Sequence, residues 1–243
     1  MRLDKFLASS KIGTRKEVKK LIKAGVVRVN GRIVKDPSFD VKENDVIEVR
    51  GSKVEPPRKV YIILNKPKGF VSSTKDPRDP TVVDLIDHPY SEDLFPVGRL
   101  DKDAEGLIIL TNDGEFAHKV ISPKYAVERE YLVKVDRRVN ERILRDLTSG
   151  VKLKDGHVAK AKEVKIVSEE GGEISLVLTE GKYHEVKRML SAAGLKVLSL
   201  KRIRLGNLKL DENLSPGSWR ELDEREVASI LEGGSEEKDK NGT

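Results

Sequence analysis

The chain has 243 residues, of which 36% are charged, and its 47 Lys and Arg against 41 Asp and Glu give a formal net charge of +6. It contains no cysteine, which excludes disulfides and thiolate chemistry. Because no apolar run approaches the ~20 residues of a membrane span, and the N-terminus lacks the apolar segment of a signal peptide, we expect a cytoplasmic protein without a membrane partner.

The positive charge is concentrated in the first quarter of the chain. Residues 1–59 carry 16 Lys and Arg against 8 Asp and Glu, whereas residues 223–243 carry 3 against 7 and the remainder is nearly neutral. A small basic unit beside a larger neutral one indicates a nucleic-acid-binding module joined to a second domain. The predicted division is a module with its linker at 1–59, a larger domain at 60–232 and a disordered polar tail at 233–243.

The basic segment begins with two predicted helices. The first carries apolar residues at helical spacing from Leu3 to Leu7. The second begins at Thr14, which with Glu17 fits a capping box, and ends at Gly25. Five of the ten residues from 14 to 23 are basic and one is acidic, a bias that favours phosphate binding over an ordinary solvated helix face.

Strands are predicted after these helices. Two β-branched runs surround Asn30-Gly31, which is a strong signal for a hairpin, and residues 39–49 suggest a further strand pair. The order of helix, basic helix and "GVVRVNG" hairpin resembles an S-four-type RNA-binding module over residues 1–50. The resemblance implies RNA rather than DNA as the target. The residues predicted to bind it are Arg2, Arg15, Lys16, Lys19, Lys20, Lys23 and Arg28.

The larger domain reads as many strands with few helices between them. "VYIILNKPKGFVSS" predicts a strand, a turn and a second strand, and "VEREYLVKV" alternates so that Arg129, Tyr131 and Val133 share one face. "GKYHEVKRMLSAAG" predicts a helix with Val186, Met189, Leu190 and Ala193 inward. The expected fold is α+β, a small basic α/β module followed by a larger domain with a mixed, mainly antiparallel sheet.

The acidic stretch from Asp101 to Gly106 allows several interpretations. Carboxylates at loop positions 1, 3 and 5 with glycine at 6 imitate a calcium loop, but Asn112 stands where a bidentate Glu is required and no helix follows. A solvated turn is the simplest alternative. The four histidines are scattered and suggest no ligand cluster, so no metal site is predicted.

Neighbouring motifs favour a third interpretation. "GRLD" at 98–101 followed by "GLIILTNDG" resembles the signature of the pseudouridine synthases that modify ribosomal RNA, in the branch that carries an S-four-type module. "NKPKG" at 65–69, "GKYHEVKRM" at 181–189 and "LSPG" at 214–217 match as well, and the resemblance covers residues 1 to about 230. The family usually has Thr where Ala104 stands and Lys where Arg129 stands.

The resemblance implies an enzyme that isomerises uridine to pseudouridine without a cofactor. The catalytic residues would be Asp101 as the essential carboxylate, Lys187 as its cation and Tyr131 as the ring that stacks on uracil. Asp103 and Glu105 would then face solvent. Whether Asp101 attacks the sugar, attacks the base or removes a proton is left open. The implied substrate-binding residues are Arg99, Arg129, His184 and Arg188, the last of which is also the alternative partner of Asp101.

The residues Tyr183, His184 and Lys187 resemble the small-subunit type of these enzymes, which implies 16S ribosomal RNA as the substrate. We expect the RNA to be presented within an assembling ribosomal subunit and the enzyme to be a monomer. Two alternatives are a large-subunit (23S) enzyme and a non-catalytic RNA-binding ribosome-assembly factor. The second alternative would explain the basic module but not the set of Asp101, Tyr131 and Lys187.

Overall fold

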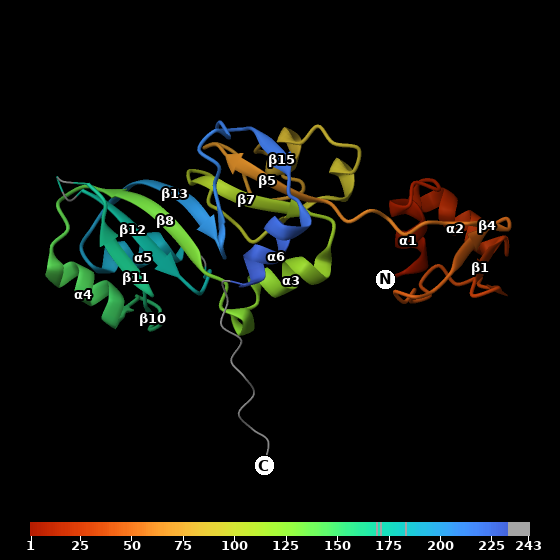
Figure 1. Ribbon diagram of the computed structural model, residues 1–243, viewed down its shortest axis with the longest axis horizontal. Coiled ribbons are helices and arrows are strands. Elements are labelled where there is room, and N and C mark those ends of the chain that lie inside the picture. Colours follow the sequence, from red (N-terminus) through yellow and green to blue (C-terminus); the bar gives the residue numbers. More distant parts are fainter. Residues whose placement is uncertain (169, 171, 183, 233–243) are drawn as a thin grey trace, which may run out of the picture. The chain divides into compact units, whose positions relative to one another are not determined.

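The computed structural model describes residues 1–168, 170, 172–182 and 184–232. The described chain forms two compact units, the first ending at Lys59 and the second beginning at Val60 (Figure 1). Tyr183 and the predicted polar tail at 233–243 lie outside the described residues. In the part of the chain that the structure describes, no helix has the length and apolar character needed to cross a membrane.

The first unit combines two helices with a four-stranded sheet of order β2-β1-β3-β4. Its elements are α1 (Leu3–Ser9), α2 (Arg15–Lys23), β1 (Val27–Val29), β2 (Arg32–Ile33), β3 (Ile47–Val49) and β4 (Ser52–Lys53). The capping box is confirmed, since Thr14 Oγ1 accepts from the Glu17 amide and Glu17 accepts from the Thr14 amide at 2.8 Å. Apolar residues of both helices, such as Leu7 and Ile22, join Ile47 of the sheet in one core.

The hairpin after α2 is confirmed, because Asn30 (φ 50°) and Gly31 (φ 77°) both adopt the left-handed conformation that such a turn needs. The predicted strand pair at 39–49 is wrong. Only Ile47–Val49 is a strand, and it pairs with β1 and β4. The preceding residues instead bond to the chain terminus, where the Val41 amide donates to the Met1 carbonyl at 2.8 Å.

The second unit is built on a nine-stranded sheet in the order β11-β12-β8-β13-β7-β5-β15, with β14 beside β13 and β6 beside β7. Every pair in this sheet is antiparallel except β13 with β7, which confirms the mixed, mainly antiparallel α+β fold. The strands are β5 (Tyr61–Lys66), β6 (Phe95–Val97), β7 (Glu105–Thr111), β8 (Arg129–Val135), β11 (Glu163–Ile166), β12 (Glu173–Leu178), β13 (Val197–Leu205), β14 (Leu208–Lys209) and β15 (Trp219–Glu221). A separate short pair is formed by β9 (Val151–Lys152) and β10 (Val158–Ala159).

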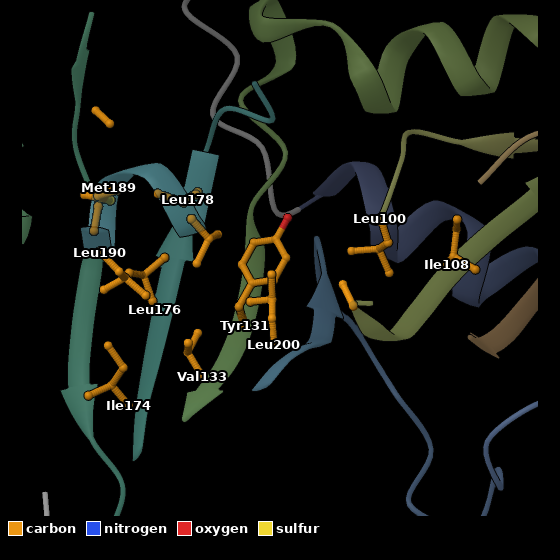
Figure 2. Close-up of a cluster of buried hydrophobic side chains, with 14 of the residues drawn as sticks. Leu100, Ile108, Tyr131, Val133, Ile174, Leu176, Leu178, Met189, Leu190 and Leu200 are labelled. Carbon is orange, nitrogen blue, oxygen red and sulfur yellow. The ribbon is translucent and has the colours of Figure 1, made fainter. Parts of the chain in front are cut away.

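Helices cover both faces of this sheet (Figure 1). Residues of α4 (Glu141–Ser149) and α5 (Glu185–Ala192) join one core, and residues of α3 (Gly114–Ile121) and α6 (Glu224–Glu232) join the other. The central strands contribute to both cores, since Leu64 belongs to the first and Ile63 to the second. Figure 2 shows the first core, where Met189 and Leu190 of α5 pack on Ile174 and Leu176.

Two predicted patterns place the site residues. Arg129, Tyr131, Val133 and Val135 are the buried positions of β8, as its alternation predicts. On α5 the predicted inward residues Val186, Met189 and Leu190 are buried, whereas Ala193 is half-buried and follows the helix. Lys187 lies beside this apolar stripe and is also half-buried. Strand periodicity therefore directs Tyr131 into the core, and helical periodicity leaves Lys187 at its edge.

Candidate active site

Asp101 lies in the loop between β6 and β7, and a buried lysine fixes the backbone of that loop. Lys66, at the end of β5, is fully buried. Its Nζ donates to the carbonyls of Ala104 (2.7 Å), Pro67 (3.1 Å) and Lys102 (3.3 Å). Burial lowers the pKa of Lys66 to about 8, so the side chain is still an ammonium at pH 7. Lys66 thus connects the "NKPKG" motif to the loop that carries Asp101.

The segment after Lys66 also binds this loop, and the second strand predicted at 70–73 is wrong. The Gly69 amide donates to the Lys102 carbonyl at 2.8 Å. Ser72 Oγ donates to the Leu100 carbonyl at 2.8 Å and accepts from the Leu100 amide at 3.0 Å. These polar groups are therefore used to hold the residues on either side of Asp101, not to extend a strand ladder.

Glycine is required where the loop enters β7. Gly106 has φ of +99°, and a Cβ at this position would lie 2.2 Å from the backbone oxygen of Arg202. That distance is far inside van der Waals contact, so β7 and β13 can approach each other here only because the side chain is absent. The approach brings the Asp101 loop next to β13.

A cluster of charges surrounds Asp101. Lys187 Nζ lies 3.0 Å from Asp101 Oδ2 and 2.6 Å from Asp103 Oδ1, and His184 Nε2 lies 3.0 Å from Asp101 Oδ1. Partial burial acts to lower the pKa of Lys187, but the hydrogen bonds to Asp103 and Asp101 raise it overall. The bond from Lys187 lowers the pKa of Asp103. Asp103 is 71% exposed, as expected of a turn residue, yet it also shares the cation of Asp101.

Asp101 and its partners line a pocket whose walls are partly polar and partly apolar. Arg99, Tyr131, His184 and Lys187 line the same pocket. Its apolar residues include Leu100, Val186, Leu178 and Leu200, and Figure 2 shows Tyr131 grouped with Leu178 and Leu200. Tyr131 is 7% exposed, whereas Arg99 is exposed. The pocket therefore combines the Asp101 carboxylate, several basic groups, an aromatic ring and apolar side chains.

Two predicted substrate-binding arginines have other partners. Arg129 lines the pocket, but its guanidinium donates to the carbonyls of Val127 (2.8 Å) and Val120 (2.9 Å) and, at 3.4 Å, to that of Thr179. Burial lowers its pKa. Arg188 forms an ion pair with Asp155 and is not among the residues that line the pocket. The structure therefore pairs Lys187, not Arg188, with Asp101.

Sequence reasoning missed a second charge group, two of whose members, Lys182 and Glu185, line the pocket. Donor atoms of His157, Glu180 and Glu185 lie within 4.8 Å of one another, which corrects the expectation that the histidines join no ligand cluster. However, Lys182 Nζ lies 3.1 Å from the His157 ring nitrogens and 3.1 Å from Glu180. An ammonium already supplies the cation for this group, so we assign no metal to it.

The geometry of the acidic loop also bears on the calcium alternative. Both carboxylates that would open a calcium loop, Asp101 and Asp103, bind Lys187. The backbone carbonyls of Lys102 and Ala104 accept from Lys66. The oxygens of this loop are thus directed at two lysine ammonium groups.

In the first unit, the basic residues predicted to bind RNA are all exposed. Arg2, Arg15 and Lys19 line one concavity with Asp4 and with Lys5, which was not among the predicted RNA-binding residues. Arg2 lies 2.9 Å and Lys19 3.7 Å from the Asp4 carboxylate. The helical spacing of Arg15 and Lys19 accounts for their common face.

Lys66→Met is expected to destabilise the protein by about 3 kcal/mol, because it leaves buried carbonyl groups without donors. Urea unfolding measures this change. The control is Lys68→Met, which removes a 52% exposed lysine paired with Glu105 at 3.4 Å and is expected to cost less than about 0.5 kcal/mol. Equal losses in the two variants would show that the Lys66 contacts are not the cause.

Comparison with known proteins identifies the two units. A family model described as RNA pseudouridylate synthase matches residues 60–192, and a model of the S4 domain matches residues 1–47. A crystal structure of a pseudouridylate synthase has a TM-score of 0.68 and 35% identity to this chain, and the match covers 95% of this chain and 99% of that one.

Relatives of similar length agree with these matches. An uncharacterized RNA pseudouridine synthase of Aquifex aeolicus is 47% identical over 232 residues, which are 95% of this chain and 96% of the relative. The ribosomal small subunit pseudouridine synthase A of Vibrio parahaemolyticus is 40% identical over 231 residues, 95% and 99% of the two chains. The chain therefore belongs to the RNA pseudouridylate synthase family and carries an N-terminal S4 domain.

Proposed function

We propose that the protein converts a uridine of 16S ribosomal RNA to pseudouridine, in the pocket that contains Asp101. The observation that carries the proposal is the grouping of Asp101, Tyr131 and Lys187 around one pocket. The reaction needs a carboxylate against the sugar–base unit, a cation that stabilises the carboxylate and a surface for a flat ring. This combination also favours an enzyme over a non-catalytic RNA-binding factor.

In the proposed mechanism the target nucleotide leaves its RNA stack and its uracil enters the pocket. The ring of Tyr131 stacks on the uracil, a contact worth ~1–3 kcal/mol that offsets part of the cost of unstacking. Asp101, oriented by Lys187 and His184, acts as the nucleophile or base. The bond from uracil N1 to the ribose breaks, the ring turns, and C5 bonds to the ribose instead. Arg99 contacts the RNA at the pocket.

The choice of 16S RNA rests on relatives and on the α5 segment. Curated relatives at 37% to 40% identity are named ribosomal small subunit pseudouridine synthase A. In this chain His184 is the N-cap of α5 and contacts Asp101, so His184 and Lys187, two of the residues that suggested the small-subunit type, line the pocket. We propose that the enzyme acts as a monomer on RNA of the assembling subunit.

Incubation with separate 16S- and 23S-containing particles, followed by sequencing of pseudouridine sites, tests this proposal. A single new site in 16S RNA is the expected result. Modification of 23S RNA alone would retain the reaction but overturn the substrate. No modification in either particle, or in the naked RNAs, would overturn the proposed function as a whole.

The S4 domain is expected to supply RNA affinity through phosphate contacts. Arg15→Gln combined with Lys19→Gln should make the negative slope of log affinity against log salt shallower by about 1.5. With two phosphate contacts fewer, RNA binding releases fewer counterions. Binding of RNA measured at several salt concentrations gives this slope. Lys53→Gln, which removes the same type of charge from an exposed ion pair with Glu55, should leave the slope nearly unchanged. An unchanged slope in the double variant would remove this surface from the RNA interface.

A further inference from the structure

A buried arginine in the pocket has donor capacity that the protein does not use. Arg202, on β13, is 2% exposed. Its Nε donates to the Leu107 carbonyl at 2.7 Å. Its Nη2 is buried and has no hydrogen-bond partner. Among the described residues it is the buried side-chain polar atom of which this is true. Arg202 also lines the pocket.

The position of Arg202 within the sheet places it beside the proposed stacking ring. Arg202 pairs directly with Tyr131 across the antiparallel β13–β8 ladder. Opposite residues of such a ladder point to the same face of the sheet. Because both side chains also line the pocket, a base stacked on Tyr131 would lie next to the guanidinium.

The charge of Arg202 is not neutralised within the described chain. No described carboxylate forms an ion pair with it. The other buried arginine of the pocket, Arg129, is also cationic and binds backbone carbonyls. Burying an unpaired charge is costly unless a partner compensates for it. A negatively charged or strongly accepting oxygen of a bound ligand would therefore supply the partner that Arg202 lacks.

The isomerisation itself produces such an oxygen. When the bond between uracil N1 and the ribose breaks, its electron pair stays on the uracil and is shared among N1, O2 and O4. If Asp101 instead adds to uracil C6, the negative charge develops at C5 and O4. In both routes C5 then bonds to the ribose, and the proton lost from C5 is balanced by the proton gained at N1. O4 is thus the carbonyl oxygen that carries charge in either route.

We propose that the Arg202 guanidinium donates a hydrogen bond to uracil O4 and stabilises the negative charge that develops on the detached or adduct base. The inference rests on the proposed pseudouridine synthase function and deepens it. A fixed hydrogen-bond donor accelerates a reaction most where it faces charge that appears in the transition state. Arg202 would thus accelerate bond cleavage rather than contribute to affinity for the RNA.

Arg202→Met, which keeps an unbranched apolar stem and removes the charged guanidinium, tests this role. At saturating RNA labelled with tritium at uracil C5, single-turnover release is expected to slow by about 10²–10³-fold, with RNA affinity nearly unchanged. The melting temperature should not fall by more than a few degrees, because the variant loses one hydrogen bond but also an unpaired buried charge. Arg202→Lys, which keeps the charge, should recover part of the rate.

The matched control is Arg204→Met on the same strand. Arg204 is paired with Glu128 at 3.1 Å and Glu130 at 2.7 Å and does not line the pocket. This variant should lose stability and keep a cleavage rate close to that of the wild type. The proposal would be overturned if Arg202→Met lost at least as much stability as Arg204→Met together with its cleavage rate. That result would assign Arg202 a structural role.

Thio-substituted substrates locate the bond. For each enzyme, the rate with 4-thiouridine at the target is divided by the rate with uridine. This ratio should differ between the wild type and Arg202→Met by tenfold or more. The corresponding ratio for 2-thiouridine should be the same in both enzymes. If the Arg202→Met substitution changed the effect of 2-thiouridine instead, or of neither analogue, the assignment of the hydrogen bond to O4 would be overturned. If Arg202→Met does not fold, Arg202→Lys serves in the same comparison. Turnover by the wild type is measured first. Its absence would refute the proposed function, whereas wild-type turnover without the expected Arg202 effects would refute only the role of Arg202.

Discussion

Asp101→Asn is expected to reduce tritium release from C5-labelled RNA by at least about 10³-fold, the scale on which a positioned acid–base group contributes. The amide has the shape of the carboxylate but can act as neither nucleophile nor base. Asp101 contacts Lys187 and His184, each at 3.0 Å, and its side chain is only 22% exposed. These contacts belong to a partly solvated cluster, so the melting temperature should change little.

Asp103→Asn is the control for this variant. Asp103 also binds Lys187, at 2.6 Å, but is 71% exposed and does not line the pocket. It should retain most of the activity, because the carboxylate that faces the base is untouched. Equal inactivation by the two substitutions would indicate that the charge cluster as a whole matters and that Asp101 has no separate role. Turnover by Asp101→Asn would exclude it as the essential carboxylate.

Lys187→Met is expected to lower the rate of the chemical step by about 10²-fold, because Asp101 loses the cation that orients it and stabilises its charge. Arg188→Met, one residue along the helix, should lose much less, since Arg188 pairs with Asp155. Single-turnover rates measured at saturating RNA distinguish the two. A larger loss for Arg188→Met would mean that the neighbouring basic residue is the partner.

An independent measurement reports on the Lys187 charge itself. The hydrogen bond from Lys187 lowers the pKa of Asp103, so in Lys187→Met this pKa should rise toward the ordinary value of an aspartate. An NMR titration of the Asp103 carboxyl would detect the change in the free enzyme. An unchanged pKa would show that the ammonium does not act on this cluster in solution, whatever the kinetic effect of the variant.

Several parts of the fold follow from local sequence alone. The capping box of α2, the Asn30-Gly31 hairpin and the alternation of β8 each depend on residues a few positions apart. The predictions failed where distant contacts compete with local preference. Residues 70–73 bond to the loop around Leu100, and residues near Val41 bond to the chain terminus.

The motifs of the sequence also indicated Asp101, Tyr131 and Lys187, and the structure brings them to one pocket. Motif order could not indicate which groups support them. Lys66 is an ordinary lysine in the sequence, but it is fully buried against the Asp101 loop. Likewise, His157 meets Glu185 only because the β9–β10 hairpin lies beside α5.

By itself, the sequence determined the elements and the chemical character of this protein: a basic S4 domain, an α+β family fold, and the carboxylate, lysine and tyrosine of the candidate site. Only the tertiary structure decided that Lys187 is shared by Asp101 and Asp103, and that Arg202 is buried beside Tyr131 with an unused donor. The reason is physical. Capping and periodicity act over a few residues, whereas the burial and pairing of a charge depend on strands and loops that are far apart in the chain.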